Sequence, residues 1–530
     1  MKPWVFRAAD VLARPVGPLD VGVVLFLSLL PLALTPAIPS IDFYGHVLRY
    51  DVLATGGSSE AIAASYRPAW ALLPNLGLDI LGAALLKIMP PLAGGKLIAA
   101  MVAVAPFLGV LALARALGGR VEFHQLLLAA ILIFSHIYVW GFSNFLFGFG
   151  LALGALALWI ALEDRPSRQL GAAILLAPVL LIVHALAFAV FGLLLALVEL
   201  AAAMAERRLN TRALVVRGAR LAAVAALPIV LFLLSRTTEA ADGITGSFNR
   251  LAAIQAQGAL GPRLVAEIGS RIDTLLRVAD STFADADRLL SLLLWTGLGL
   301  ALARRILVLD RRLALAVPVV LVAVALTPPV LFGVGYVDDR LPLVLLALLA
   351  AGTRLDPELP AAKPLVAGLG VLFLVRLMLV AAAHGKAGVI YEDYLARIRD
   401  LPTGQTAVLL LGTGVGRDGD QPFCSPLGPL LAFRNGTAVP TWANRSQQPI
   451  EVTGPMARAM EVRRLRRASL PPGRDETVAG LLEAGFDTVI YCTRGPGPPL
   501  EPGVRLLAEG TLWRVFGRAA PGPASARPPG

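Results

Sequence analysis

The sequence is poor in charge for its length. Of its 530 residues, 16% are Asp, Glu, Lys or Arg, and 57% are hydrophobic. A soluble domain of this length could not keep so much apolar surface out of water, which excludes an ordinary soluble enzyme. The formal net charge of +11 would suit a nucleic-acid-binding protein. Most of the arginine clusters, however, stand in short loops between apolar runs, which indicates membrane topology and no nucleic-acid partner.

Other absences narrow the choice further. The chain has no glycine-rich loop for a nucleotide cofactor. It has no small-residue cleavage site after the first apolar run, so we expect a retained helix rather than a signal peptide. Cysteine is scarce, and Cys424 and Cys492 both lie in the C-terminal part. An oxidising compartment would permit a disulfide between them, but the sequence leaves their pairing open.

The chain has, instead, a series of apolar runs that suit a bilayer core about 30 Å thick. The stretch from Gln169 to Met204 is too long for one span, and we divide it near His184 into two helices. A further piece, residues 70–90, contains Pro, Asn, Asp and Lys, which predicts an interfacial or re-entrant amphipathic helix. We predict about eleven spans, at 19–38, 94–114, 122–139, 144–162, 169–184, 186–204, 217–235, 289–303, 313–333, 341–352 and 364–383.

Lysine and arginine in the short loops orient the chain. Lys2, Arg7 and Arg14 precede the first span, which places this end in the cytoplasm. The basic residues of five later loops fall on the same side when the spans alternate. We therefore predict a mainly α-helical polytopic protein of a bacterial inner membrane, N-in and C-out. Its long loops 38–92 and 236–288 lie outside.

This topology gathers ionisable residues at the extracytoplasmic face. They include three of the five histidines and four acidic residues: His46, His136, His184, Asp42, Asp51, Asp338 and Asp339. Polar groups at spanning depth are costly, so their concentration on one side predicts a water-filled site that opens there. The alternative is that each of them caps a helix or reaches to the membrane interface.

The first outer loop begins "IPSIDFYGHVLRYDVLATGG". Asp42, His46 and Arg49 stand at i, i+4 and i+7, so a helix would place them on one face, with Asp51 off that stripe. A carboxylate among apolar neighbours can gain enough proton affinity to work as a general base. Asp42 could instead be only the N-cap of this helix.

Three stretches carry a family resemblance. They are "PSIDFYGHVLRY" in the first loop, "YRPAWALLPNLGLD" at 66–79 and "GYVDDRLPLVLLALL" at 335–349. With many spans and a C-terminal extracytoplasmic domain, the chain resembles the GT-C superfamily of integral-membrane glycosyltransferases. The resemblance implies transfer of a hexosyl or pentosyl group from a polyprenyl-phosphate donor. The acceptor would be an extracytoplasmic glycan, lipid or protein.

The resemblance also implies roles for particular residues. Asp42 matches the base that acts on the acceptor hydroxyl. Arg340, with Arg49 or Arg67, matches the groups that hold the lipid phosphate, since guanidinium pairs phosphate oxygens bidentately. His46 would orient the carboxylate or the donor phosphate.

One departure from the family concerns metal. Members commonly have two adjacent acidic residues in the first loop, whereas Phe43 follows Asp42 here. A divalent cation is therefore an open alternative, and no metal ligands are assigned. The pair Asp338 and Asp339 could bind a hard cation or could compete for Arg340 at a helix end.

Further candidates are weaker. Asn75 and Asp79 are i and i+4 on the predicted helix 70–90, facing either the site or water. His136 flanks a tight outer hairpin, and His184 marks a helix break; either could contact substrate or only a neighbouring helix. Three nearby aromatic residues are typical of a membrane-interface belt: Tyr138, Trp140 and Phe142.

After His384 the composition changes to that of a small α/β domain. Residues 406–412 and 487–492 are predicted strands, 477–486 a helix and 504–516 a hairpin. We therefore predict three parts. They are a membrane domain at 1–385, an extracytoplasmic α/β domain at 386–518, and a disordered tail at 519–530.

Two other functions stay open. A transporter or lipid flippase would be favoured by two homologous halves, but the chain shows no internal repeat and too little charge inside its spans. A non-catalytic scaffold for envelope assembly would leave the outer ionisable residues unexplained. The sequence does not indicate the donor sugar, the acceptor, the linkage or the oligomeric state.

Overall fold

The structure is a computed structural model of the chain. It describes residues 15–206, 211–237, 260–328, 330–331, 334–356, 359–401, 404–416, 419–441, 443, 447–470 and 475–519. The chain divides into two compact units. The first unit contains residues 1–30, 72–77 and 99–381, and the second contains 31–71, 78–98 and 382–530.

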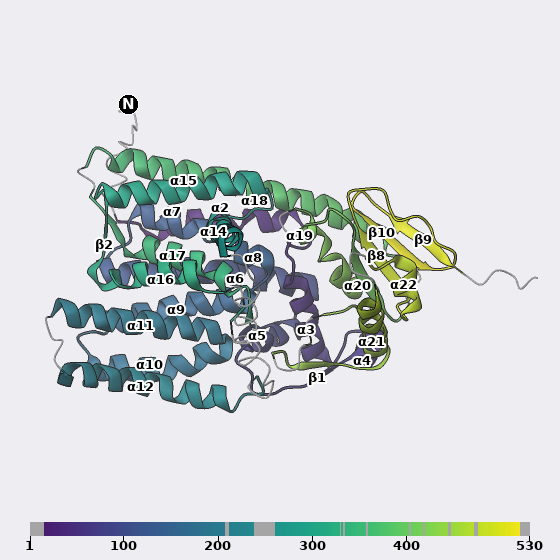
Figure 1. The fold of residues 1–530 in the computed structure, drawn as a ribbon, viewed down its shortest axis with the longest axis horizontal. Helices are drawn as coiled ribbons and strands as arrows, with labels where there is room; N and C mark the ends of the chain where they lie inside the picture. Colours follow the sequence, from purple (N-terminus) through teal and green to yellow (C-terminus); the bar gives the residue numbers. More distant parts are fainter. Residues whose placement is uncertain are drawn as a thin grey trace, which may run out of the picture. The chain divides into compact units, whose positions relative to one another are not determined.

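The first unit is a helical bundle. Its longer helices include α9, α10, α11 and α12, which pack against one another in chain order (Figure 1). The helices are α2 (Pro18–Leu29), α6 (Pro91–Gly118), α7 (Phe123–Ile131), α8 (His136–Trp140), α9 (Ser143–Ala161), α10 (Pro166–Val183), α11 (Ala185–Ala205), α12 (Thr211–Leu233), α14 (Leu260–Leu276), α15 (Ala284–Ala303), α16 (Ala316–Leu326), α17 (Val337–Gly352) and α18 (Ala362–Arg397). The start of α6 and the end of α18 belong to the second unit.

Short elements complete this part of the chain. The 3-10 helices are η1 (Leu30–Leu34), whose residues from Pro31 belong to the second unit, and η2 (Arg311–Leu313). The antiparallel strand pairs are β2 (Leu307–Leu309) with β5 (Thr353–Leu355), and β3 (Val330–Leu331) with β4 (Val334–Gly335).

Apolar runs fold as helices throughout the first unit. Eight helical stretches in the described residues are long and apolar enough to cross a membrane, with α7 and α8 counted as one. Every predicted span coincides with a helix, although α2 with η1, α16 and α17 are shorter than a full span, so the count of eleven stays a prediction. The predicted division at His184 is confirmed, because its extended backbone separates α10 from α11.

The second unit combines early and late parts of the chain. Its elements are α3 (Phe43–Thr55), α4 (Glu60–Ser65), β1 (Tyr66–Pro68), α5 (Gly77–Leu86), β6 (Ala407–Leu411), α19 (Gln421–Cys424), α20 (Leu427–Asn435), β7 (Ile450–Val452), α21 (Gly454–Ser469), α22 (Val478–Glu483), β8 (Thr488–Cys492), β9 (Val504–Glu509) and β10 (Trp513–Arg518). Strands β6, β8, β10 and β9 form a sheet in that order, with β6 parallel to β8. The predicted strands, helix and hairpin of the C-terminal part are confirmed.

A strand pair joins the first loop to the C-terminal segment. Strand β1 pairs antiparallel with β7, and the Tyr66 hydroxyl donates to the Val439 carbonyl at 2.6 Å. The domain boundaries at 385 and 518 stay predictions. The second unit contains, besides the C-terminal segment, residues 31–71 and 78–98, which were assigned to the membrane domain from sequence.

Two predictions about the first loop region need correction. Helix α5 covers only Gly77–Leu86 of the amphipathic helix predicted over 70–90. Asn75 therefore lies in a turn before α5, not one helical turn from Asp79 as expected. The prolines at 68 and 74 explain the difference, because the residue before a proline is disfavoured in helical conformation. In the other long outer loop, 236–288, the apolar spacing of "LAAIQAQ" (251–257) predicts a further helix along the membrane surface, and this segment lies outside the described residues.

A disulfide closes part of the second unit. Cys424 of α19 is bonded to Cys492 of β8, across a sequence separation of 68 residues. The sequence left this pairing open. A cross-link that closes a long loop reduces the entropy of the unfolded chain.

We expect the Cys424→Ala, Cys492→Ala double variant to lower the free energy of unfolding of the second unit by about 2–4 kcal/mol. Thermal unfolding in detergent, followed with and without a reductant, measures this. The wild type should lose stability on reduction, whereas the double variant should not respond to the reductant. Equal melting of all four samples would contradict a stabilising disulfide.

A second prediction concerns helix packing in the bundle. A Cβ atom at Gly150 of α9 would lie 2.3 Å from the carbonyl carbon of Ala105 in α6, so the close approach of these helices needs glycine. We expect Gly150→Ala to cost about 1–3 kcal/mol through overpacking. Gly154→Ala is the matched control, because nothing lies within 4 Å of a Cβ there. Melting of both purified variants in detergent compares them, and equal melting would refute the packing argument.

Candidate functional site

The first-loop cluster consists of Asp42, His46, Arg49 and Asp51 with Asp79 of α5, all in the second unit. Arg49 Nε lies 2.6 Å from Asp79 Oδ1, and Nη2 lies 3.3 Å from Oδ2. The two side chains are 1% and 0% exposed. Removing one partner of such a buried pair typically costs about 3–5 kcal/mol, because it leaves the other charge without compensation.

The same arginine fixes the protonation of His46. Arg49 Nη1 lies 2.8 Å from His46 Nδ1. A guanidinium can only donate, so Nδ1 accepts and the ring carries its proton on Nε2. Burial, together with the charge of Arg49, lowers the pKa of His46 well below 6.5. His46 is therefore neutral at physiological pH and presents an Nε2–H donor.

Asp42 occupies the N-cap position of α3, but its side chain makes no capping hydrogen bond. Asp42 is half-buried, and its carboxylate interacts electrostatically with the guanidinium of Arg49. Asp42 thus stands at the N-cap, as the capping alternative expected, but without a capping hydrogen bond from its side chain. Its role as a base stays a prediction.

Asp51 lies off the stripe, as predicted, and is buried. Its Oδ2 atom has no hydrogen-bond partner among the described residues. Burial raises the pKa of Asp51, although a hydrogen bond with Ser58 opposes the shift. A buried carboxylate oxygen without a hydrogen bond destabilises the folded state, and carboxyl groups with a raised pKa are frequent at functional sites.

Arg67 differs from the rest of the predicted set. It lies exposed on β1, and its Nε donates to Glu451 Oε2 of β7 at 2.6 Å. An exposed pair of this kind contributes about 0–1 kcal/mol. The part of Arg67 in phosphate binding stays a prediction.

The α17 cluster, in the first unit, comprises Tyr336, Asp338, Asp339 and Arg340 with Phe142 and Phe145 of the α8–α9 region. Arg340 is 5% exposed, and its Cζ lies 4.4 Å from the centroid of the Phe142 ring and 5.4 Å from that of Phe145. Its Nε and Nη1 atoms form no hydrogen bond with any described residue. The structure thus places a buried cation with unused donors at the start of α17.

The carboxylates of this cluster do not form the pair that the sequence suggested. Asp338 Oδ2 accepts from Arg271 Nη1 of α14 at 2.7 Å. Asp339 Oδ1 lies 3.5 Å from the Thr274 hydroxyl. Asp338 forms its ion pair with Arg271, 67 residues away, although the charges of both Asp338 and Asp339 also act on Arg340.

The structure also bears on a divalent cation. Among the described residues, no group of three or more His, Cys, Asp or Glu side chains comes together. Asp338, one of the two adjacent acids, already neutralises Arg271. The divalent cation stays an open alternative, with no set of protein ligands assigned to it.

His136 belongs to a third polar cluster, which lies in the first unit. Trp140 Nε1 donates to His136 Nε2 at 2.8 Å, and His136 Nδ1 lies 2.6 Å from Asp280 Oδ2. Since an indole only donates, Nε2 accepts and the imidazole donates from Nδ1 to Asp280. Burial raises the pKa of Asp280, but hydrogen bonds from His136 and Thr282 and the charge of Arg376 have the larger combined effect. The pKa therefore lies below its ordinary value.

His184 and Asn75 have structural contacts in the first unit. His184 caps α11, because its Nδ1 accepts from the Leu186 amide at 3.1 Å, and its ring contacts Phe145 edge-on. The Asn144 side chain donates to the Asn75 carbonyl at 3.0 Å. Substrate contacts of His184 and Asn75 stay predictions.

The aromatic residues were wrongly interpreted from sequence. Trp140, expected in an interface belt, is 6% exposed and lies against Tyr336 at 4.5 Å between ring centroids. Tyr138 is also buried and packs edge-on against Phe134. No spacing signal relates Trp140 to Tyr336, because they lie on different helices far apart in sequence.

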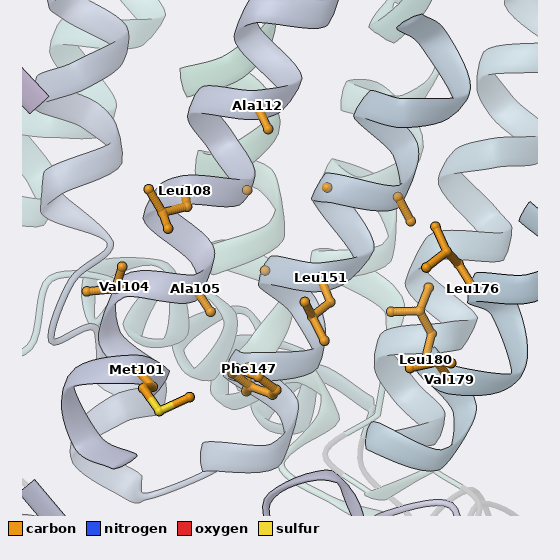
Figure 2. A pocket seen from close by; sticks show the side chains of 14 residues that line it. Met101, Val104, Ala105, Leu108, Ala112, Phe147, Leu151, Leu176, Val179 and Leu180 are labelled. Atoms are coloured by element: carbon orange, nitrogen blue, oxygen red, sulfur yellow. The ribbon is translucent and has the colours of Figure 1, made fainter. Parts of the chain in front are cut away.

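An apolar pocket of about 570 Å³ lies between α6, α9 and α10 of the first unit. Figure 2 shows Met101, Leu108, Phe147, Leu151 and Leu180 directed towards it. No titratable residue lines it, so it can hold hydrocarbon but cannot take part in proton transfer.

Three known structures that resemble the chain are two of one protein and one of another. ArnT from Cupriavidus metallidurans in the apo state matches with a TM-score of 0.51 and 11% identity, over 94% of this chain and 97% of that one. ArnT bound to undecaprenyl phosphate matches with 0.49 and 12%, over 95% and 98%. An oligosaccharyltransferase from Archaeoglobus fulgidus in the apo form matches with 0.41 and 12%, over 89% and 69%. No family model and no curated protein matches the chain.

We expect Asp51→Asn to stabilise the protein at neutral pH, because it removes a buried carboxylate whose pKa is raised in the folded state. The stability linked to protonated Asp51 is fully present below the unfolded pKa, about 3.9, and is lost as pH rises through the folded pKa. The gain from the amide should therefore shrink as the pH is lowered towards 4. Thermal melting of both proteins across this range measures it, and a variant less stable than wild type at neutral pH would refute it.

Proposed function

We propose that this chain, which has the fold of the GT-C membrane glycosyltransferases, transfers a sugar from a lipid-linked donor to an acceptor on the extracytoplasmic side. It is a multi-pass membrane protein with eight apolar helices of spanning length in its described part. The carrier is a polyprenyl phosphate, the class of lipid that ArnT binds. A hexosyl or pentosyl group is transferred to a glycan, a lipid or a protein.

The observation that carries this proposal is the state of Arg340. Burying a guanidinium is costly, and two of its nitrogen atoms lack hydrogen bonds within the described chain. A phosphate oxygen would satisfy these donors in the geometry that arginine prefers. Arg340 is also the residue that the family resemblance assigns to the lipid phosphate. Its positive charge would stabilise the phosphate as it leaves the sugar.

Asp42 is the proposed general base. In the transfer, the acceptor hydroxyl attacks the anomeric carbon, its proton passes to the carboxylate, and the bond from this carbon to the phosphate oxygen breaks. Although Asp42 stands at the N-cap of α3, its side chain makes no capping hydrogen bond, which supports the role. His46, held neutral with its proton on Nε2, can donate a hydrogen bond to an anionic oxygen.

The disulfide supports the orientation. Disulfides persist in oxidising compartments and are rare in the cytosol. The bond between Cys424 and Cys492 therefore favours an extracytoplasmic second unit, which agrees with the N-in, C-out orientation predicted from loop charges. Asp42 and His46 belong to the same unit.

We expect Asp42→Asn to reduce sugar transfer by at least about 100-fold, because an amide cannot take the acceptor proton. The assay offers the purified protein a panel of undecaprenyl-phosphate-linked sugars with envelope glycan and lipid acceptors. Glu60→Gln is the matched control: it removes an exposed acid from the same loop and should keep full activity. Transfer that survives in folded Asp42→Asn would exclude Asp42 as the base, and it would return the residue to a structural role.

A further inference from the structure

Three aromatic rings gather beside Arg340 in the first unit. The Trp140 ring lies 5.4 Å from Phe142 and 4.5 Å from Tyr336, and Phe142 lies 5.9 Å from Tyr336, measured between centroids. Their planes differ by 18°, 38° and 28°, so all three rings face in a similar direction. Trp140 is buried, whereas Phe142 and Tyr336 are half-exposed. The result is an aromatic platform, backed by Trp140, that presents two rings to its surroundings.

The platform is held from behind by polar bonds. The indole N–H of Trp140 is bonded to His136, which is in turn bonded to Asp280. These bonds fix the plane of the indole against which the other two rings rest. Tyr336 precedes α17 with a left-handed backbone at φ 56°, a conformation that an aromatic residue keeps only where its surroundings hold it. Strain of this kind tends to be found at ligand-binding positions.

The cation lies one helical turn beyond Tyr336. Arg340 sits over the Phe142 ring at 4.4 Å, with Nε and Nη1 unused by the described residues. A flat apolar surface and a cation with free donors thus stand side by side. This pairing has the chemistry of a pyranose or furanose ring joined to a phosphate. The C–H bonds of a sugar face are weakly positive and meet the negative face of an aromatic ring, while the phosphate meets the guanidinium.

We propose that Tyr336 binds the sugar ring of the glycosyl phosphate, supported by Trp140 and by Phe142, whose face Arg340 covers, while Arg340 binds the phosphate. This inference rests on the proposed function and adds to it the residue that recognises the sugar. Tyr336 is then a specificity-determining residue, and Phe142, Trp140, His136 and Asp280 are positioning residues. The plain alternative is that the three rings only pack the bundle.

The test separates sugar binding from phosphate binding. Affinities of the purified full chain are measured for undecaprenyl phosphate and for a panel of undecaprenyl-phosphate-linked monosaccharides. We expect Tyr336→Leu to weaken the sugar-linked lipid about three- to ten-fold, with bare undecaprenyl phosphate changed less than about two-fold. Tyr336→Phe keeps the ring and should keep the wild-type ratio of the two affinities. Arg340→Met should weaken both lipids.

Phe149→Leu is the packing control, because this fully buried ring stacks on Phe145 and is not part of the platform. It should lower the melting temperature but leave the ratio of the two affinities unchanged. Equal loss of both lipids in Tyr336→Leu, or no loss of either, would overturn the platform and leave the proposed function intact. A wild-type protein that binds neither lipid would overturn both proposals.

Discussion

A buried charge must be met by a partner, and this constraint organises the polar interior of both units. In a chain so rich in apolar residues, few water molecules are available to compensate an unpaired ion. Arg49 is met by Asp79, Arg271 by Asp338, and the Asp280 carboxylate by His136. Arg340 stands out against this pattern. Its Nε and Nη1 atoms find no acceptor in the described chain, and, unlike Arg376, in which the same two atoms are unsatisfied, it has no hydrogen bond from Nη2 to a described carbonyl. An acceptor atom of a ligand could bond to these two nitrogen atoms of Arg340 and complete the site.

The Arg49–Asp79 pair has effects beyond its own energy. Because Arg49 donates to Asp79 and to His46 together, one guanidinium fixes both the ion pair and the tautomer of the histidine. From the sequence, Arg49 was expected to hold the lipid phosphate, His46 to orient the carboxylate or the donor phosphate, and Asp79 to face either the site or water. The structure shows them to be coupled, so that a change at Asp79 would also alter the proton on His46, although Asp79 lies on a different helix.

Local patterns in the sequence predicted local structure well. The apolar runs became helices, His184 separates α10 from α11, and the C-terminal strands lie where alternation and turn residues placed them. The stripe of Asp42, His46 and Arg49 was correct because helical spacing alone determines it. The failures concern residues that meet from distant parts of the chain. His136 and Asp280 are 144 residues apart, and no spacing rule relates them. The platform was missed for the same reason, since a tryptophan near a predicted membrane surface has an ordinary explanation.

The pairing of β1 with β7 also sets an order of events during synthesis. Tyr66 and its partner Val439 are separated by 373 residues, which take roughly 20–75 s to translate at about 5–20 residues per second. Throughout that time, the first outer loop lacks the strand that completes it. Its apolar side chains and the unpaired edge of β1 stay accessible to chaperones and proteases until nearly the whole chain has been inserted. The residues of the first-loop cluster, including the Arg49–Asp79 pair, are thus all made early, whereas the strand that pairs with β1 is made late and is missing from chains truncated before residue 450.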